Sequence, residues 1–116
     1  MSSPTARTLA VLREQGFRCQ IVEKWIAQAR KRVDLWGFID ILYMDTAIVG
    51  VQVTSGSNHA ARRTKILTEC REDALKWLSL RGVIQVRSWS RRKVGSRVRW
   101  VERITEITID DFEAEA

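Results

Sequence analysis

The sequence lacks the features that mark several common classes of protein. It has no run of about 18 apolar residues, the length that a helix needs to cross a membrane, so we expect no membrane association. Its first residues contain no basic segment followed by an apolar one, so we expect no secretory signal and a cytoplasmic location. The sequence also contains no internal repeat and no low-complexity segment.

Residues that form disulfides or bind zinc are scarce. The chain has two cysteines, Cys19 and Cys70, and a single histidine, His59. A structural zinc site takes about four cysteine or histidine ligands, so we expect no such site here. In a reducing compartment the two cysteines are expected to be small buried side chains, and His59 is expected to be exposed near a helix N-terminus.

Apolar and basic residues are abundant instead. Hydrophobic residues make up 45% of the 116 residues, which predicts one folded domain spanning residues 1–116. The net charge of +6 includes an acidic C-terminal tail at 110–116, so the rest of the chain is more basic still. Basic residues cluster at 30–32, 62–65 and 87–103, which favours a polyanionic partner such as nucleic acid.

Hydrophobic spacing and turn residues predict an α/β domain. Ser3 and Pro4 are typical of a helix start, and Gly16 is typical of the position after a helix end. Alternating and β-branched residues predict strands, and apolar residues three and four apart predict a second, longer helix. The predicted order is a helix at 4–15, strands at 17–25, 34–44 and 47–54, a helix from Ser57 or Asn58 to 81–82, and strands at 83–86 and 97–107, with a loop at 27–32 and a basic turn at 91–95.

Polar side chains interrupt the hydrophobic strands. Asp40 lies in the middle of one strand, where a carboxylate is costly to bury unless it is paired, protonated or bound to a metal. Gln52 interrupts the next strand in the same way, and Glu23 lies near the end of the preceding one. Local propensity does not explain this pattern, and such exceptions tend to mark functional sites.

These positions supply the oxygen ligands that a hard divalent cation prefers. The carboxylate of Asp40, the amide oxygen of Gln52, the backbone carbonyl of Val53 and a water held by Glu23 are expected to bind Mg²⁺ or Mn²⁺. Such an ion polarises a phosphate and lowers the pKa of a bound water, so the pattern favours phosphodiester hydrolysis. The structural alternatives are a carboxylate paired with arginine, a core amide satisfied by backbone groups and an exposed acid at a strand end.

Over about residues 5–90 the chain resembles the PD-(D/E)XK nuclease superfamily. The order of elements resembles its restriction-endonuclease-like core, α-β-β-β-α-β-β, a mixed central sheet flanked by helices. Asp40 matches the acidic position on one strand of a hairpin, Gln52 matches the first position of (E/Q)-x-K on the next, and Glu23 resembles an additional upstream acid. The runs 32–40 and 52–55 look like small phage-type, Holliday-junction-resolvase-like or VRR-NUC-like members. The resemblance implies a Mg²⁺- or Mn²⁺-dependent deoxyribonuclease from the cytoplasm of a bacterial or phage-infected cell.

The chain departs from the family pattern at Thr54, which stands where (E/Q)-x-K has its lysine. Some members supply this lysine from the following helix, which implies Lys65 here, with Arg62 three residues earlier on the same helix face. The resemblance thus implies catalytic roles for Glu23, Asp40, Gln52 and Lys65. Contacts with the DNA backbone are expected from Lys31, Arg32, Arg62, Arg63, Arg91, Arg92 and Lys93.

Two other functions fit the same sequence. Without a lysine at position 54 the domain could bind DNA and not cut it, and its basic surface could instead bind an acidic protein partner. Lys65 would then be an ordinary surface lysine. Asp34 is expected to cap or brace the loop before its strand. A homodimer is a further expectation, by analogy with small nucleases that need a second copy to cut two strands.

Overall fold

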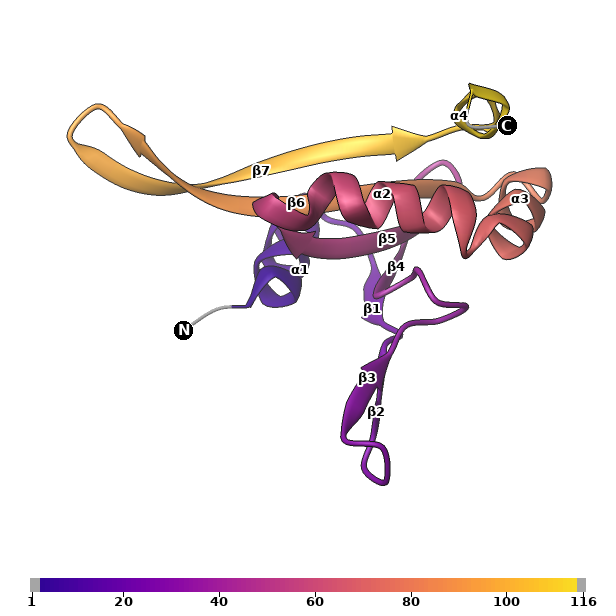
Figure 1. Ribbon diagram of the computed structural model, residues 1–116. Helices are drawn as coiled ribbons and strands as arrows, with labels where there is room; N and C mark the ends of the chain where they lie inside the picture. Colours follow the sequence, from indigo (N-terminus) through magenta and orange to yellow (C-terminus); the bar gives the residue numbers. More distant parts are fainter. Residues whose placement is uncertain (1–2, 115–116) are drawn as a thin grey trace.

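The structure is a computed structural model and describes residues 3–114 (Figure 1). It is an α/β domain built on a mixed five-stranded sheet of order β1-β4-β5-β6-β7, and a second, two-stranded sheet contains β2 and β3. The elements are α1 (Pro4–Glu14), β1 (Cys19–Ile21), β2 (Lys24–Ile26), β3 (Lys31–Val33), β4 (Ile41–Met44), β5 (Ile48–Ser55), the 3₁₀ turn η1 (Gly56–Asn58), α2 (His59–Thr68), α3 (Arg71–Ser79), β6 (Val83–Val94), β7 (Arg97–Ile107) and α4 (Ile109–Ala114).

Helix α1 begins and ends where the sequence predicts. The hydroxyl of Ser3 accepts a hydrogen bond from the Ala6 amide at 3.1 Å, and proline follows it in the first turn. Gly16 has a φ of 88°, a left-handed conformation that glycine adopts without steric cost. Leu9 and Leu12 are buried and form a core with residues of β4 and β5. The predicted helix at 4–15 is therefore confirmed.

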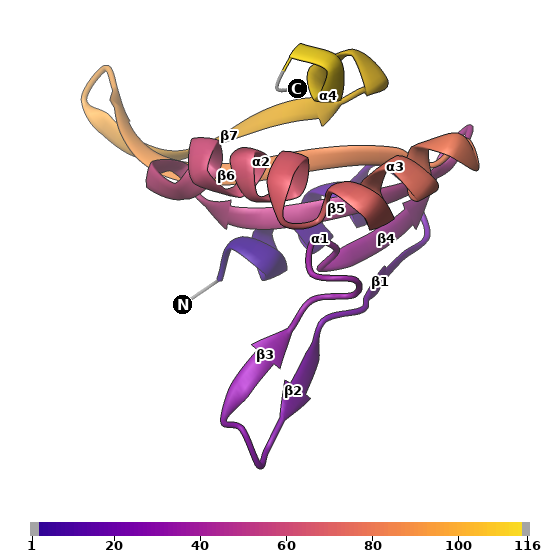
Figure 2. The ribbon, with the colours of Figure 1, turned by 45° about the vertical axis from the view of Figure 1, so that its right-hand side comes forward.

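Strands β4, β5 and β6 form the centre of the sheet. The predicted hairpin of β4 and β5 is confirmed, with Ile41 opposite Val51. β5 and β6 are parallel, and α2 and α3 make the connection between them. These two helices cover one face of the sheet and α1 lies against the other (Figure 2). The core under α2 and α3 contains Phe38, Ile39, Ile66, Leu67, Cys70, Ala74, Ile84, Val86, Ile107 and Phe112.

The predicted strand at 17–25 is wrong in its second half. The chain leaves the main sheet after Ile21. Lys24–Ile26 pairs instead with Lys31–Val33 in a hairpin that projects from the body (Figures 1 and 2). The predicted loop at 27–32 is a turn only as far as Arg30, whose φ is 50°. This hairpin has few apolar residues to bury, so hydrophobic periodicity gave no signal for it.

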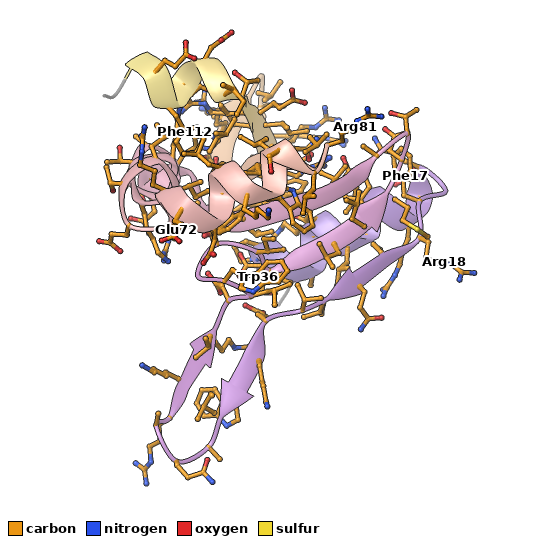
Figure 3. All side chains as sticks on the ribbon, turned by 90° about the vertical axis from the view of Figure 1, so that its right-hand side faces the viewer. Phe17, Arg18, Trp36, Glu72, Arg81 and Phe112 are labelled. Atoms are coloured by element: carbon orange, nitrogen blue, oxygen red, sulfur yellow. The ribbon has the colours of Figure 1, made fainter. Side chains whose placement is uncertain are left out.

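The predicted strand at 34–44 is wrong in its first half. Trp36 and Gly37 have φ values of 53° and 83°, which no strand accommodates, and they close a tight turn. Leu35 and Ile39 pair across this turn. Trp36 then lies at the root of the β2–β3 hairpin and packs against Trp77 of α3, with ring centroids 5.9 Å apart (Figure 3).

The predicted long helix is divided into two helices, α2 and α3. Asn58 precedes α2, but its side chain makes no capping hydrogen bond. The amide of Cys70 donates to the carbonyl of Lys65 five residues earlier, which ends the α2 pattern. Two acidic residues, Glu72 and Asp73, then suit the first turn of α3. The predicted stop at 81–82 is confirmed.

The predicted strand at 97–107 is confirmed as β7, β6 is longer than predicted, and the acidic tail contains a helix. β6 runs on to Val94, so 91–94 belong to a strand and only Gly95 and Ser96 form the turn. Within the predicted tail at 110–116, α4 extends to Ala114 and buries Phe112 in the core; residues 115 and 116 lie outside the described part. No helix within residues 3–114 is long and apolar enough to cross a membrane.

Candidate active site

One polar cavity collects the predicted acidic residues. Its volume is about 440 Å³, and it lies where the β2–β3 hairpin, the start of β4, the end of β5 and helix α2 meet. We call it the acid cavity. It is lined by Thr5, Glu23, Lys31, Arg32, Val33, Asp34, Gly37, Asp40, Gln52, Val53, Arg62 and Lys65.

The β4–β5 hairpin positions Asp40 beside Gln52. Asp40 directly precedes β4, and its amide donates to the carbonyl of Val51 at 2.8 Å. The Asp40 Oδ2 atom accepts hydrogen bonds from Gln52 Nε2 at 2.8 Å and from the Val53 amide at 2.7 Å. Asp40 and Gln52 are only 3% and 2% exposed, so these hydrogen bonds fix the carboxyl group rigidly at the base of the cavity.

Glu23 and Asp34 complete a group of three acids. The carbonyl of Asp40 accepts hydrogen bonds from the amides of Val22 and Glu23 at 2.8 and 3.3 Å, which fixes Glu23 above the cavity. The turn after Asp34 brings its carboxylate back to the cavity, where Asp34 Oδ2 accepts from Gln52 Nε2 at 3.2 Å. Glu23, Asp34 and Asp40 each offer a carboxylate oxygen, and these oxygens all lie within 4.8 Å of one another.

The crowding of acids alters the ionisation of Asp40. Burial raises the pKa of Asp40 from its ordinary value of 3.8 to about 8. The side-chain interaction with Asp34 and the charges of Asp34 and Glu23 raise it as well, whereas the hydrogen bond from the Val53 amide lowers it. At neutral pH the carboxyl group therefore keeps its proton unless a cation offsets the cost of ionisation.

The Gln52 amide bridges the buried Asp40 and the partly exposed Asp34 through its nitrogen. Nε2 donates to both Asp34 and Asp40, so the nitrogen faces the acids, where a ligand oxygen had been predicted. Its Oε1 atom is buried, and no hydrogen-bond partner for it exists among residues 3–114. Rotation of the amide by half a turn would place that oxygen beside the acids.

Four predicted basic residues surround the acids. Lys65 and Arg62 of α2 line the acid cavity from one side, and Lys31 and Arg32 of β3 line it from the other. Arg32 Nη1 lies 2.8 Å from Glu23 Oε1 and is mostly exposed. The cavity can therefore attract an anion such as a phosphate while its acids hold a cation.

The remaining predicted basic residues lie elsewhere. Arg63 pairs with Asp111 of α4 at 2.9 Å. Arg91, Arg92 and Lys93 are exposed near the end of β6. Thr54, at the position where the resemblance led us to look for a lysine, is buried within β5.

Two residues differ from their predicted surroundings. Asp34 had been interpreted as a brace for a loop, and its carboxylate lies in the acid cavity. A signal for this was the Gly37 three residues later, which allows the turn that folds Asp34 back toward Asp40. His59 had been expected to be exposed; it is 1% exposed, and its ring nitrogens bond Ser88 at 2.6 Å and Thr105 at 2.9 Å.

No family model, curated protein or solved structure matches this chain. The acid cavity and the charges around it are therefore the features that indicate what the chain does. Its fold is described by the mixed five-stranded sheet and the helices on its faces.

Proposed function

We propose that this chain is a metal-dependent endonuclease that hydrolyses phosphodiester bonds in DNA, on a restriction-endonuclease-like core. The observation that carries this proposal is the group of three carboxyl oxygens within 4.8 Å, in one cavity with Lys65 and Arg62. Three acids repel one another, and a protein that only needed a stable fold would gain by replacing one of them. Their retention in a cavity open to solvent favours a ligand of opposite charge.

The acids fit a hard divalent cation such as Mg²⁺ or Mn²⁺. Asp34, Asp40 and Glu23 supply carboxylate oxygens, the ligand type that these ions prefer. The backbone of Val53, which lines the cavity, is a further donor, and so is the unpartnered Oε1 of Gln52 once its amide rotates by half a turn. When bound there, the ion would neutralise phosphate charge and supply a water of lowered pKa for attack on phosphorus.

The side chains around the acids have separable tasks in this proposal. Gln52 and the Val53 amide hold Asp40 in one orientation, so a ligand meets a preorganised carboxylate. Lys65 and Arg62 attract the scissile phosphate and stabilise the negative charge that builds on its oxygens. Lys31 and Arg32 of β3 also line the cavity and bind the neighbouring phosphates. As the DNA enters, Arg32 would break its ion pair with Glu23 and pair with a phosphate instead.

The position of Lys65 favours it as the replacement for the motif lysine. Thr54 lies two residues after Gln52 and is buried, so it offers no charge to the cavity. Lys65 comes from the helix that follows β5 and lines the acid cavity with Gln52. A lysine can therefore serve the same cavity from a different element.

Cleavage of supercoiled plasmid tests the proposal. Native protein should nick the plasmid with Mg²⁺ or Mn²⁺, and excess chelator should abolish nicking. We expect Asp40→Asn to lower the rate by at least about a hundredfold and Lys65→Ala by about tenfold to a hundredfold, because each removes transition-state stabilisation. Lys76→Ala, which removes an exposed lysine from α3, is the matched control and should retain the native rate.

A second candidate is a domain that binds DNA and does not cut it. It is favoured by Thr54 at the lysine position and by the Arg32–Glu23 ion pair, which occupies a carboxylate oxygen of the acid cavity. Salt-dependent DNA binding with no nicking by either metal, on plasmid or branched DNA, would assign this function instead. If the protein has no affinity for DNA at low salt, the remaining function is that of a basic module that binds an acidic protein partner.

A further inference from the structure

The last two strands of the sheet continue past it as a two-stranded arm. Ser55, the last residue of β5, pairs with Trp89 of β6, so beyond Trp89 strand β6 pairs only with β7. We call residues 91–101 the arm; all of them are exposed, and Figure 1 shows the arm extending at the left, beyond the helices. The turn at its tip contains Gly95, with a φ of 65°.

The arm is strongly basic and contains no acidic residue. Because directly opposite residues of an antiparallel pair share a face, the Arg92–Arg99 and Val94–Arg97 pairs place three arginines on one face. Like charges that face each other across two strands destabilise the pair, so this arrangement does not serve the fold. We call it the arginine face, and its charges suit an external polyanion.

The opposite face of the arm contacts the body through Trp100. Trp100 lies opposite Arg91, and the guanidinium of Arg7 from α1 lies 3.6 Å from the Trp100 ring centroid. Guanidinium groups from two elements therefore lie over the indole, which stays 45% exposed. No other aromatic residue occurs at 91–101, so the arm offers little for stacking on the bases of a single strand.

The root of the arm is held in a fixed direction. Trp89 Nε1 donates to Thr8 of α1 at 2.9 Å, which ties β6 to the helix beneath it. Gly56 packs so closely against Ser90 that an added Cβ would overlap the serine hydroxyl. On the other side His59 connects α2 to both β6 and β7. The arm therefore projects as an extension of a rigid body.

The arm leaves the sheet at the end where the acid cavity lies. β5 and β6 run parallel, so Gln52 and Val53 of the cavity and residues 91–94 of the arm both lie toward the same end of these strands. From Arg91 to Gly95 the arm spans four residue steps, or about 13 Å at about 3.3 Å per residue. The major groove of B-form DNA is about 12 Å wide and about 8.5 Å deep and accepts a two-stranded ribbon.

We propose that the arginine face of the arm binds in a groove of double-helical DNA and holds a duplex against the acid cavity. This inference rests on the proposed function, because it names the substrate of that site as duplex DNA. The chemistry selects against the other nucleic acids. A-form RNA presents a deep, narrow major groove that side chains do not enter, and a single strand is bound best by several stacked aromatics, of which the arm has only Trp100.

Fluorescence anisotropy with a labelled 20-base-pair duplex tests the arm. The assay contains chelator and no divalent metal, so binding is measured apart from cleavage. We expect the Arg92→Gln/Arg97→Gln/Arg99→Gln variant to bind the duplex about tenfold or more weakly than native protein. Its slope of log affinity against log salt should fall by about 2 to 3, since each lost phosphate contact contributes about 0.9.

A variant of equal charge loss is the matched control. Arg13, Arg18 and Arg81 are exposed residues outside the arm; Arg18 directly precedes β1, and Arg81 lies before the start of β6, at the opposite end of that strand from the arm. Their triple replacement by glutamine should weaken binding much less than the arm variant. All six positions are exposed, so we expect both variants to melt at nearly the same temperature as native protein, which would show that each is folded.

Several results would overturn the inference. They are an arm variant that binds the duplex as tightly as native protein, equal weakening by the two triple variants, or a native preference for single-stranded DNA or duplex RNA. A change in oligomeric state with unchanged affinity would instead assign the arm to self-association. The proposed nuclease activity is tested separately. If duplex binding depends on the arm but native protein does not nick DNA, the inference about the arm holds and the proposed endonuclease activity is wrong. If native protein nicks DNA but its affinity for the duplex does not depend on the arm, the endonuclease activity holds and the inference about the arm is wrong.

Discussion

At the scale of single residues, Asp40 combines burial with two neighbouring acids. Its folded pKa of about 8 lies well above the ordinary value of 3.8, so between these values the native state holds a proton that the unfolded chain releases. The stability that this proton contributes is complete below about pH 3.8 and is lost as pH rises through about 8. The contribution of Asp40 to the stability of the metal-free folded protein is therefore least favourable at alkaline pH.

This sign leads to a prediction for Asp40→Asn. Asparagine keeps an acceptor oxygen for the Val53 amide but cannot ionise, so its advantage over aspartate should grow with pH. In chelator, urea unfolding should give the variant a higher free energy of unfolding than native protein at pH 8.5, by about 1 kcal/mol or more, and a smaller difference at pH 5. Parallel pH profiles of the two proteins would contradict the assignment of the titration to Asp40.

The site residues differ in how far sequence could predict them. Asp40 and Gln52 stand out because each places a polar group in a hydrophobic run, a conflict that is visible without any structure. Asp34 gave no such conflict, because an acid before a strand has a common local role. Its place in the acid cavity depends on the positive φ values of Trp36 and Gly37, and a tryptophan in that conformation has no sequence signal.

At the scale of elements, His59 joins three of them. It begins α2, and its two ring nitrogens reach β6 through Ser88 and β7 through Thr105. Burial lowers the pKa of His59 below its ordinary value of 6.5, and the charge of Arg103 lowers it further. As pH falls below about 6.5, the unfolded chain takes up the proton first, so this residue makes the fold less stable.

We therefore expect the pH dependence of stability to change in His59→Gln. Glutamine does not titrate, so native protein should lose more stability than the variant between pH 7.5 and pH 5.5. At pH 7.5 the variant should be less stable by about 1 to 3 kcal/mol, because buried hydroxyls lose a partner. Urea unfolding at both pH values measures the two effects, and an equal loss in both proteins would exclude His59 as the titrating group.

The elements themselves were predictable where local and long-range forces agree. α1 and the β4–β5 hairpin have both the right turn residues and apolar side chains to bury. The β2–β3 hairpin and the extension of β6 to Val94 have neither, since their residues are mostly exposed and basic. Their strand structure comes from backbone pairing with a partner strand, which single-sequence periodicity does not report.

At the scale of the whole molecule, cation binding and folding are coupled. The three acids come from the segment before β2, the turn after β3 and the residue before β4, so they meet only in the folded chain. A ligand that binds the native state alone stabilises it in proportion to the logarithm of its concentration. The acid cavity should therefore report its ligand through the melting temperature, independently of any cleavage.

Thermal unfolding with and without Mn²⁺ tests this coupling and the assignment of Asp34. At a metal concentration about ten times the dissociation constant, the native state gains about 1.4 kcal/mol, which for a domain of this size raises the melting temperature by roughly 5 °C. Asp34→Asn should lose most of this rise, because it removes one of three ligand oxygens. Asp73→Asn, which removes an exposed acid from α3, should keep it. Equal rises in both variants would place the cation elsewhere, and no rise in native protein would remove the cation from the proposed mechanism.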